Sequence, residues 1–345
     1  MSVRQGTWAI VLAGGDGTRL SSLTTDERGD AVPKQFCSLN GGPSLLHETL
    51  QRARRIVPRE RVCTIVARQH ERHWQHMLWS LPARNVIVEP RNCGTANGML
   101  HGLLRILERD PLARIVFLPA DHYVHDEASL ADSMRTAAMF VTRDRDGVTL
   151  IGIEPDDIDI ELGYIVPGDP VEDGIRRVAQ FVEKPTATLA RDLIARGAVW
   201  NSFIFWAHAA TLLALIRSRL PEIVEQMTNA LARDWRGDED TPALEELYES
   251  LPIIDFSRAV MQDAESVLRV STAPACGWTD LGTPRRVVQT LQRLQLASAI
   301  QPPERALPAS TYVDLAANCA RLSSAIRRPS DDAQQRWRSC HTQGG

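Results

Sequence analysis

The chain has 345 residues, enough for one large α/β domain with an appendage or for two domains. Its 43 % hydrophobic and 24 % charged residues exclude a disordered or collagen-like chain. The net charge is −4, so no global cationic field exists, and we exclude nucleic-acid binding through broad phosphate neutralisation.

Four short apolar runs alternate with helically spaced segments in the first third of the chain. The runs are Trp8–Ala13, Val62–Ala67, Val86–Val88 and Arg114–Leu118, and the segments are Leu45–Ile56, His70–Leu78 and Ala96–Leu107. Continuous apolar strands alternating with amphipathic helices are typical of βαβ units around a sheet buried on both faces. We therefore predict a doubly wound α/β fold with a mostly parallel sheet.

After Leu150 the alternation is less regular, and no internal repeat is visible. We expect strands at Tyr164–Val166, Ile175–Val182 and 266–270, and helices near Ala187–Arg196, across 209–250 and at Pro284–Leu296. The second half is thus expected to be a lid built onto the same sheet. We divide a main domain, 1–298, into the halves 1–150 and 151–298.

Residues 299–345 are predicted to form a C-terminal extension, because Pro302, Pro303 and Pro308 interrupt regular structure. A helix is expected over about 311–327, followed by a loose tail. Its apolar stripe steps by three and four residues through Tyr312, Leu315, Cys319, Leu322 and Ile326. This stripe could dock on the main domain or pair two subunits, and we favour docking.

Cysteine usage and hydropathy indicate the compartment. The six cysteines lie far apart with no C-x-x-C pair, which fits neither a zinc site nor a disulfide-dense scaffold. The run Trp8–Ala13 ends in glycines instead of a cleavage site, and polar residues interrupt the apolar stretch Val199–Ile216. We expect reduced thiols, a cytoplasmic location and no membrane span.

The strongest local signal is a glycine-rich turn directly after the first strand. It reads Leu12-Ala13-Gly14-Gly15-Asp16-Gly17-Thr18-Arg19-Leu20. Backbone N–H groups of such a turn can approach phosphates closely, and the Arg19 guanidinium can clamp one. No G-K-[ST] closes the turn, and Leu20 stands where a dinucleotide fingerprint needs its third glycine. A tight turn would explain the glycines alone, and Arg19 favours phosphate binding.

Lysine is rare in this chain, because only two of the 39 basic residues are lysines. Lys34 stands in Pro33-Lys34-Gln35-Phe36, and Lys184 stands in Val182-Glu183-Lys184-Pro185. A chain that uses arginine as its ordinary surface cation is expected to keep lysine where a compact ammonium is needed.

Taken in order, these motifs resemble the sugar-1-phosphate nucleotidylyltransferases, whose N-terminal pattern reads roughly GGxGTRLxPLT…PKQ. Further matching motifs are Glu89-Pro90, Gly94-Thr95-Ala96, Pro119-Ala120-Asp121-His122, Gly163-Tyr164-Ile165, Trp200-Asn201-Ser202 and Gly277-Trp278-Thr279-Asp280-Leu281-Gly282. The resemblance runs from about residue 7 to residue 295. It is most similar to the mannose-1-phosphate guanylyltransferase branch.

The resemblance implies that a sugar 1-phosphate attacks the α-phosphorus of an NTP and releases pyrophosphate. It implies catalytic roles for Arg19, Lys34, Asp121 and Asp280, with the two aspartates holding Mg²⁺. Nucleotide-binding positions in the first half are then Leu12, Ala13, Gly14, Gly15, Gly17, Thr18, Arg19, Glu89, Pro90, Gly94 and Thr95. Sugar-phosphate-binding positions in the second half are Gly163, Glu183, Lys184 and Asn201. GTP and mannose 1-phosphate are the expected pair.

Three departures from the family pattern leave the substrate pair open. Cys93 stands where Arg is common, Asn97 where Pro is common and Phe203 where many members have Gly. Another NTP, another hexose or a cyclitol 1-phosphate therefore remains an alternative, as does a non-catalytic, nucleotide-sugar-binding regulatory relative. A homodimer is left open. The acidic run Glu154–Glu161 lacks the glycine and spacing of an EF-hand, and we expect a solvated loop.

Overall fold

The computed structural model describes residues 6–236, 242–298 and 312–327. In this part of the chain a single sheet has the strand order β3-β2-β1-β4-β8-β5-β9-β7-β6, with an additional pairing of β8 with β6. The strands are β1 (Thr7–Ala13), β2 (Val62–Ala67), β3 (Val86–Glu89), β4 (Arg114–Pro119), β5 (Val148–Ile153), β6 (Tyr164–Glu172), β7 (Ile175–Val182), β8 (Val199–His208) and β9 (Leu268–Ala273).

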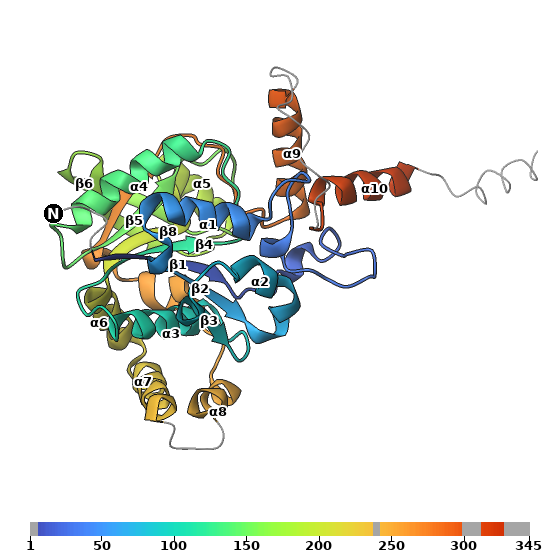
Figure 1. Cartoon of the computed structure of the whole chain (residues 1–345). Helices are drawn as coiled ribbons and strands as arrows, with labels where there is room; N and C mark the ends of the chain where they lie inside the picture. The colour runs from blue at the N-terminus through green and yellow to red at the C-terminus, as the bar shows by residue number, and fades with distance from the viewer. Residues whose placement is uncertain (1–5, 237–241, 299–311, 328–345) are drawn as a thin grey trace, which may run out of the picture.

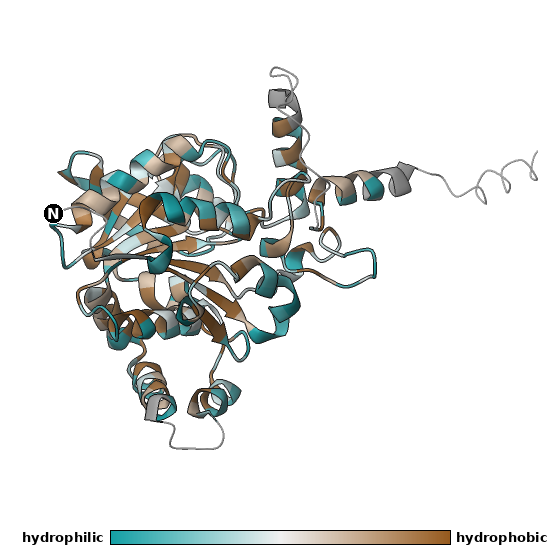
Figure 2. Ribbon diagram, in the orientation of Figure 1, coloured by the Kyte–Doolittle hydropathy of each residue, from teal (hydrophilic) through white to brown (hydrophobic). Residues whose placement is uncertain are grey.

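Helices cover both faces of this sheet (Figure 1). The hydrophobic core on one face is completed by α1 (Leu45–Ile56), α2 (Glu71–Leu78), α4 (Glu127–Val141), α5 (Ala187–Ala195), α9 (Pro284–Ser298) and α10 (Leu315–Arg327). The core on the other face is completed by α3 (Thr95–Leu107), α6 (Ala209–Arg219), α7 (Pro221–Arg236) and α8 (Ala243–Ser250). Figure 2 shows largely hydrophobic strands between helices with one hydrophilic face. The doubly wound α/β prediction is confirmed.

Strand direction divides the sheet into two parts. β1 pairs in parallel with β2 and β4, and β2 pairs in parallel with β3. β8 is antiparallel to both β4 and β5, and β7 is antiparallel to β6 and β9. The expected parallel sheet is therefore found in the first half, while the second half is mixed. Only Asp173 and Gly174 separate β6 from β7, and so short a connection can join only antiparallel strands.

The segment after residue 311 docks on the main domain. Leu315 is fully buried, its N–H donates to the Ser38 carbonyl at 3.0 Å, and Ser38 N–H donates to the Val313 carbonyl at 2.9 Å. The Asn318 side chain donates to the Leu23 carbonyl at 2.8 Å. The observed α10 thus follows the docked alternative. The expected loose tail and the Leu322 and Ile326 side chains lie outside the described residues, and the domain boundaries remain predictions.

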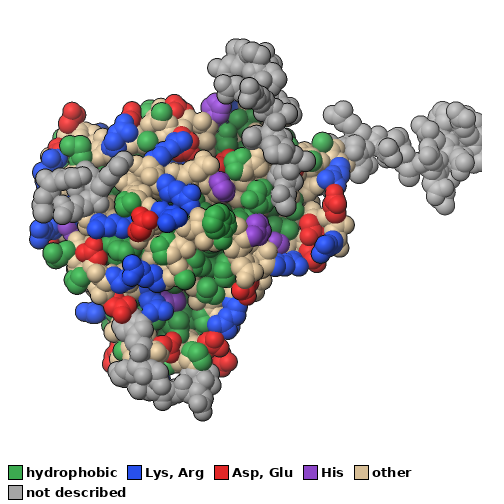
Figure 3. Space-filling model, viewed as in Figure 1, with side chains coloured by type: hydrophobic (Ala, Val, Ile, Leu, Met, Phe, Trp, Pro, Cys, Tyr) green, Lys and Arg blue, Asp and Glu red, His purple; other side chains and the backbone are tan. Residues whose placement is uncertain are grey.

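Three sequence-level expectations can be compared with this fold. Cys37, Cys63, Cys93, Cys276 and Cys319, which are the described cysteines, are free. None of the described helices has the length and apolarity needed to cross a membrane. On the face that Figure 3 shows, basic side chains are interspersed with acidic ones, as a net charge of −4 suggests.

Candidate active site

A cleft of about 400 Å³ opens beside the carboxyl ends of β1, β3 and β4. Open α/β sheets bind ligands at this edge. The residues named from the sequence that line the cleft are Leu12, Gly14, Gly15, Arg19, Glu89, Gly94, Thr95, Asp121, Gly163, Glu183, Lys184, Asn201 and Asp280. Those that do not line it are Ala13, Gly17, Thr18, Lys34 and Pro90. The structure therefore gathers most of these positions from across the chain into one cavity.

The glycine turn packs directly against the Pro33-Lys34-Gln35 segment. The buried Gln35 side chain donates from Nε2 to the carbonyls of Ala13, at 2.9 Å, and Gly15, at 2.7 Å. Gly17 has φ 64°, and a Cβ there would lie 2.9 Å from the Lys34 backbone nitrogen. Both the conformation and the close approach require glycine. The two motifs thus form one structural unit that fixes the turn.

The Lys34 ammonium connects two loops that are distant in sequence. It lies 3.1 Å from Asp121 Oδ2 and also donates to the Asp280 backbone carbonyl. Reciprocal hydrogen bonds between Tyr123 and Thr279, both 2.9 Å, join the same loops. Lys34 thus links the loops that carry Asp121 and Asp280, and both aspartates line the cleft whereas Lys34 does not.

The charge state of Asp121 suits a ligand of hard cations. Burial opposes its ionisation, but the neighbouring Lys34 ammonium, assisted by His122, keeps the pKa of Asp121 below its usual value. Among the described residues, no group of three or more His, Cys, Asp or Glu side chains is arranged to hold a metal alone. Mg²⁺ is commonly held by one or two carboxylates together with substrate phosphates. Asp121 and Asp280, which both line the cleft, are carboxylates of the type that this shared mode of binding uses.

Glu89 is a buried carboxyl group beneath the glycine turn. A Cβ on Gly14 or on Gly98 would lie 2.8 Å from its Oε2, and Tyr248 donates to its Oε1 at 3.0 Å. Burial raises the pKa of Glu89 to about 8. The group is therefore mainly protonated at neutral pH and can itself donate a hydrogen bond.

The β3–α3 loop is fastened to the segment that follows α8. Gly94 has φ 87°, and a Cβ there would lie 2.5 Å from the Ile254 carbonyl oxygen. Asn97 Nδ2 donates to the carbonyls of Cys93, at 2.7 Å, and Pro252, at 2.9 Å. The Cys93 side chain is fully buried. Of the two departures from the family pattern, Asn97 thus fastens residue 252 to this loop, whereas the Cys93 thiol donates to the Tyr248 carbonyl at 3.6 Å.

The cleft is also lined by Glu183, Lys184 and Asn201. Burial, together with the nearby Asp255, raises the pKa of Glu183 to about 7. The Lys184 ammonium lies 3.8 Å from Asp255 Oδ2 and 3.9 Å from Glu183 Oε1. A Cβ on Gly163 would lie 2.6 Å from Glu183 Oε2 and 3.3 Å from the Asn201 Cβ. Glycine at 163 therefore leaves room for this polar cluster.

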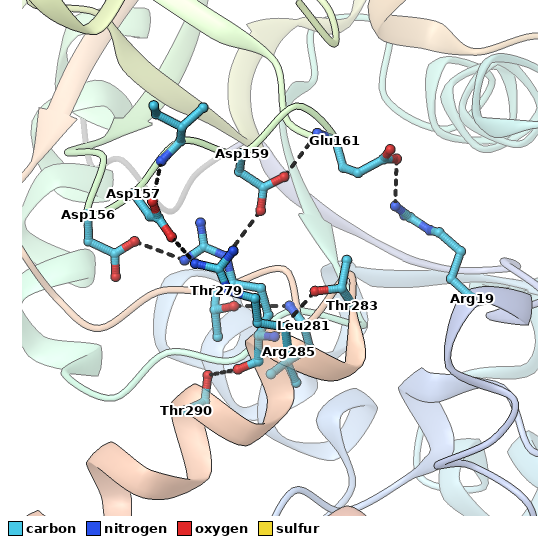
Figure 4. Close-up of polar contacts among 12 residues, drawn as sticks. Arg19, Asp156, Asp157, Asp159, Glu161, Thr279, Leu281, Thr283, Arg285 and Thr290 are labelled. Atoms are coloured by element: carbon cyan, nitrogen blue, oxygen red, sulfur yellow. Dashed lines mark hydrogen bonds and ion pairs between the residues drawn. The ribbon is translucent and has the colours of Figure 1, made fainter. Parts of the chain in front are cut away.

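Arg19 is held at the cleft rim by Glu161, at 3.1 Å (Figure 4). Glu161 ends the acidic run Glu154–Glu161, which forms a largely exposed loop as expected, although several of its carboxylates form ion pairs. Figure 4 also shows Asp156, Asp157 and Asp159 turned toward α9. The ion pairs formed there are Arg285–Asp157, Arg286–Asp156, Arg286–Asp159 and Arg293–Asp156, at 2.5 to 3.1 Å. The arginines in the predicted helix Pro284–Leu296 were the sequence signal for this contact.

Several residues that line the cleft were not assigned a role from the sequence. They are Gln35, Ile65, Asn92, Gly98, Pro119, His122, Glu161, Leu162, Phe203, Ile253, Ile254, Asp255 and Ser257. Gln35 and His122 stood inside recognised motifs, and Phe203 was noted only as a departure. The segment 253–257 carried no motif, so nothing in the sequence indicated its place here.

Most of the chain is similar in sequence to known proteins. A family model described as Nucleotidyl transferase matches residues 8–295. A mannose-1-phosphate guanylyltransferase of Salmonella muenchen is 28 % identical over 282 residues, which are 79 % of this chain and 57 % of that protein. The alginate biosynthesis protein AlgA of Pseudomonas syringae pv. tomato is 27 % identical over 79 % of this chain and 56 % of its own length. The chain thus spans a little over half the length of these relatives.

Solved structures give the same picture at the level of the fold. A mannose-1-phosphate geranyltransferase from Thermus thermophilus has 31 % identity and a TM-score of 0.71, covering 83 % of this chain and 79 % of that chain. The inositol-1-phosphate CTP transferase from T. maritima has 16 % identity and a TM-score of 0.51, covering 85 % and 97 %. At that lower identity the likeness concerns the fold alone.

Proposed function

The chain belongs to the nucleotidyl transferase family, and on that premise we propose that it transfers a nucleoside monophosphate from an NTP to a sugar 1-phosphate, releasing pyrophosphate. GTP and mannose 1-phosphate are the proposed pair. The names of the Salmonella muenchen and Thermus thermophilus relatives support mannose 1-phosphate, and the former supports GTP.

One observation carries this proposal. A single cleft is lined by the glycine turn, Arg19 and the carboxylates of Asp121 and Asp280, and also by Lys184, Glu183 and Asn201. Two polyanions must be brought together without repulsion in nucleotidyl transfer, and the two cationic side chains on the cleft wall, Arg19 and Lys184, provide for that.

The nucleotide is proposed to bind along the glycine turn and the β3–α3 loop. The residues concerned are Leu12, Ala13, Gly14, Gly15, Gly17, Thr18, Arg19, Glu89, Pro90, Gly94 and Thr95. Backbone N–H groups of the turn would donate to the phosphates, and the hydrogen bonds from Gln35 keep the turn in place. Arg19 would exchange its contact with Glu161 for a phosphate oxygen.

In the proposed step, an oxygen of the sugar phosphate forms a bond to the α-phosphorus while the bond from that phosphorus to the pyrophosphate oxygen breaks. Arg19 and Lys34 would offset negative charge on the transferring and leaving groups. Asp121 and Asp280 are proposed to hold Mg²⁺, which supplies charge neutralisation and alignment of the phosphates when bound. Lys34 also keeps Asp121 ionised and therefore able to bind a cation.

The sugar phosphate is proposed to bind beside Lys184, Glu183 and Asn201. Lys184 would contact its phosphate, Glu183 and Asn201 its hydroxyl groups, and Gly163 would allow close backbone approach. With a pKa of about 7, Glu183 is poised to donate or accept a hydrogen bond there.

The test is a matrix of the four NTPs against a panel of sugar and cyclitol 1-phosphates, with pyrophosphate release as the readout. We expect GTP with mannose 1-phosphate to have the highest kcat/KM. Preference for another pair by more than tenfold would contradict the proposed substrates while keeping the reaction class. Absence of pyrophosphate release with every pair would contradict the class and favour a non-catalytic relative.

A further inference from the structure

Phe203 has an unusual backbone conformation for its residue type. Its φ is 57°, in the left-handed region that a bulky side chain adopts only at a cost in free energy. Glycine would occupy this position without that cost. Such strain persists only where the surrounding structure enforces it, and it is concentrated at functional sites.

A break in the β5–β8 ladder produces this conformation. Leu150 pairs with Phe205 and Gly152 pairs with Asn201, so Ile151 alone stands opposite three residues of β8, centred on Phe203. Side chains hold the bulge. Ser202 Oγ donates to the Ile151 carbonyl at 2.6 Å, and Phe203 N–H donates to Asn201 Oδ1 at 3.1 Å. The bulge is thus built by neighbouring residues and does not depend on the aromatic ring.

The Phe203 ring is supported on one side and open on another. It meets Phe205 and Phe256 edge to face, with ring centroids 6.1 Å apart in both cases. Phe203 is only half-buried and lines the cleft beside Asn201 and Ser257. An exposed aromatic surface braced by two buried rings offers an apolar wall of fixed position.

We propose that Phe203 is a specificity-determining residue, whose ring forms an apolar wall beside Asn201, where the acceptor is proposed to bind, and packs against the C–H face of a single six-membered ring bearing the phosphate. This inference rests on the proposed function. The bulge fastens Phe203 to Asn201, so the apolar wall and a hydrogen-bonding group are placed as one unit. The same ring occupies space that a substituted or larger acceptor would need.

The test compares Phe203→Gly and Phe203→Leu with the wild-type chain. Phe203→Gly suits the backbone conformation and removes the wall, while Phe203→Leu keeps apolar bulk without a flat ring. We expect Phe203→Gly to raise the KM for mannose 1-phosphate at least tenfold and to leave the KM for GTP within about threefold. Its activity with N-acetylated hexosamine 1-phosphates should rise relative to mannose 1-phosphate. For Phe203→Leu, the KM for mannose 1-phosphate and the acceptor preference should lie between those of the wild-type chain and those of Phe203→Gly.

Asp263→Gly is the matched control, because Asp263 is an exposed residue with φ 59° that does not line the cleft. It should leave both KM values unchanged. Unchanged sugar-phosphate KM and acceptor preference in Phe203→Gly would overturn the inference, as would a change confined to the KM for GTP.

Calorimetry of mannose 1-phosphate binding, with a non-hydrolysable GTP analogue present, separates this inference from the proposed reaction. If the wild-type chain binds the sugar phosphate without turnover, the proposed reaction fails and the loss of affinity in Phe203→Gly still decides the role of the ring. If the wild-type chain turns over and the variant binds equally well, only the inference fails. If the wild-type chain binds no sugar phosphate, both are wrong.

Discussion

Replacing Gly94 by alanine should destabilise the chain more than any ordinary glycine substitution. Gly94 precedes α3 with φ 87° and ψ 166°, a region that only glycine occupies readily. A Cβ there would lie 2.5 Å from the Ile254 carbonyl oxygen and 2.7 Å from the Ile254 nitrogen. Both are backbone atoms, so the clash cannot be relieved by turning a side chain.

The expected loss has two parts. The backbone conformation costs about 1–3 kcal/mol for a residue with a Cβ. Forcing the Ile254 segment outward adds about 1–3 kcal/mol, as overpacking does elsewhere. Gly197 provides the control, since its φ is 78° and nothing lies within 4 Å of its Cβ position. Gly197→Ala should therefore show the cost of a positive φ without a clash.

The assay is urea unfolding of the two variants and the wild-type chain, followed by tryptophan fluorescence. The urea midpoint should fall further for Gly94→Ala than for Gly197→Ala. The free energy of unfolding should differ between the two variants by about 1–3 kcal/mol. Equal losses in the two variants would refute the close approach of Gly94 to Ile254.

Three further predictions concern the cleft. Asp121→Asn and Asp280→Asn should each lower kcat by orders of magnitude, with little further loss in the double variant, because the two carboxylates are proposed to act as a unit. Near-normal turnover of either single variant in steady-state kinetics would contradict the shared role. Lys184→Arg should raise the KM for the sugar phosphate roughly tenfold with a smaller effect on the KM for the NTP, because a planar guanidinium does not replace a compact ammonium. An unchanged KM for the sugar phosphate would make Lys184 an ordinary surface charge. The pKa of Glu89 is raised from 4.5 to about 8 in the folded chain, so between these pH values the folded chain holds a proton that the unfolded chain has released. The stabilisation from protonated Glu89 is therefore complete below about pH 4.5 and is lost as the pH rises to about 8. As the pH rises over that window, Glu89→Gln should therefore gain stability relative to the wild-type chain by up to about 1.4 kcal/mol per pH unit. Urea unfolding at several pH values measures this, and a free-energy difference between the two chains that does not vary with pH would be contrary evidence.

Local patterns predicted the strands and helices up to β4 well, because apolar periodicity there is strong. The expected run Val62–Ala67 and segment Leu45–Ile56 coincide with β2 and α1. The helix α4 was not predicted at all, although Asp126 accepts hydrogen bonds from Ala128 and Ser129 and is a capping residue in type. The Asp173-Gly174 pair was likewise an unused signal for the β6–β7 hairpin.

Contacts between distant segments were beyond what periodicity could give. The glycine turn could be identified from the sequence, but its attachment through Gln35 depends on how the loop returns to β1. The approach of Ile254 to Gly94 depends on a segment without a motif. The acidic run forms the expected exposed loop, but its arginine partners on α9, far along the chain, could not be assigned from the sequence. Charge patterns identify candidates, whereas tertiary packing selects their partners.

The most direct test of the proposed reaction is to measure both products of one reaction mixture containing GTP, mannose 1-phosphate and Mg²⁺. Mass spectrometry would quantify the nucleotide-sugar, and a coupled assay would quantify pyrophosphate. Nucleotidyl transfer in this cleft predicts equal amounts of the two products, formed by the wild-type chain and almost abolished in Asp280→Asn. Orthophosphate in place of pyrophosphate, or undiminished product formation by Asp280→Asn, would contradict it.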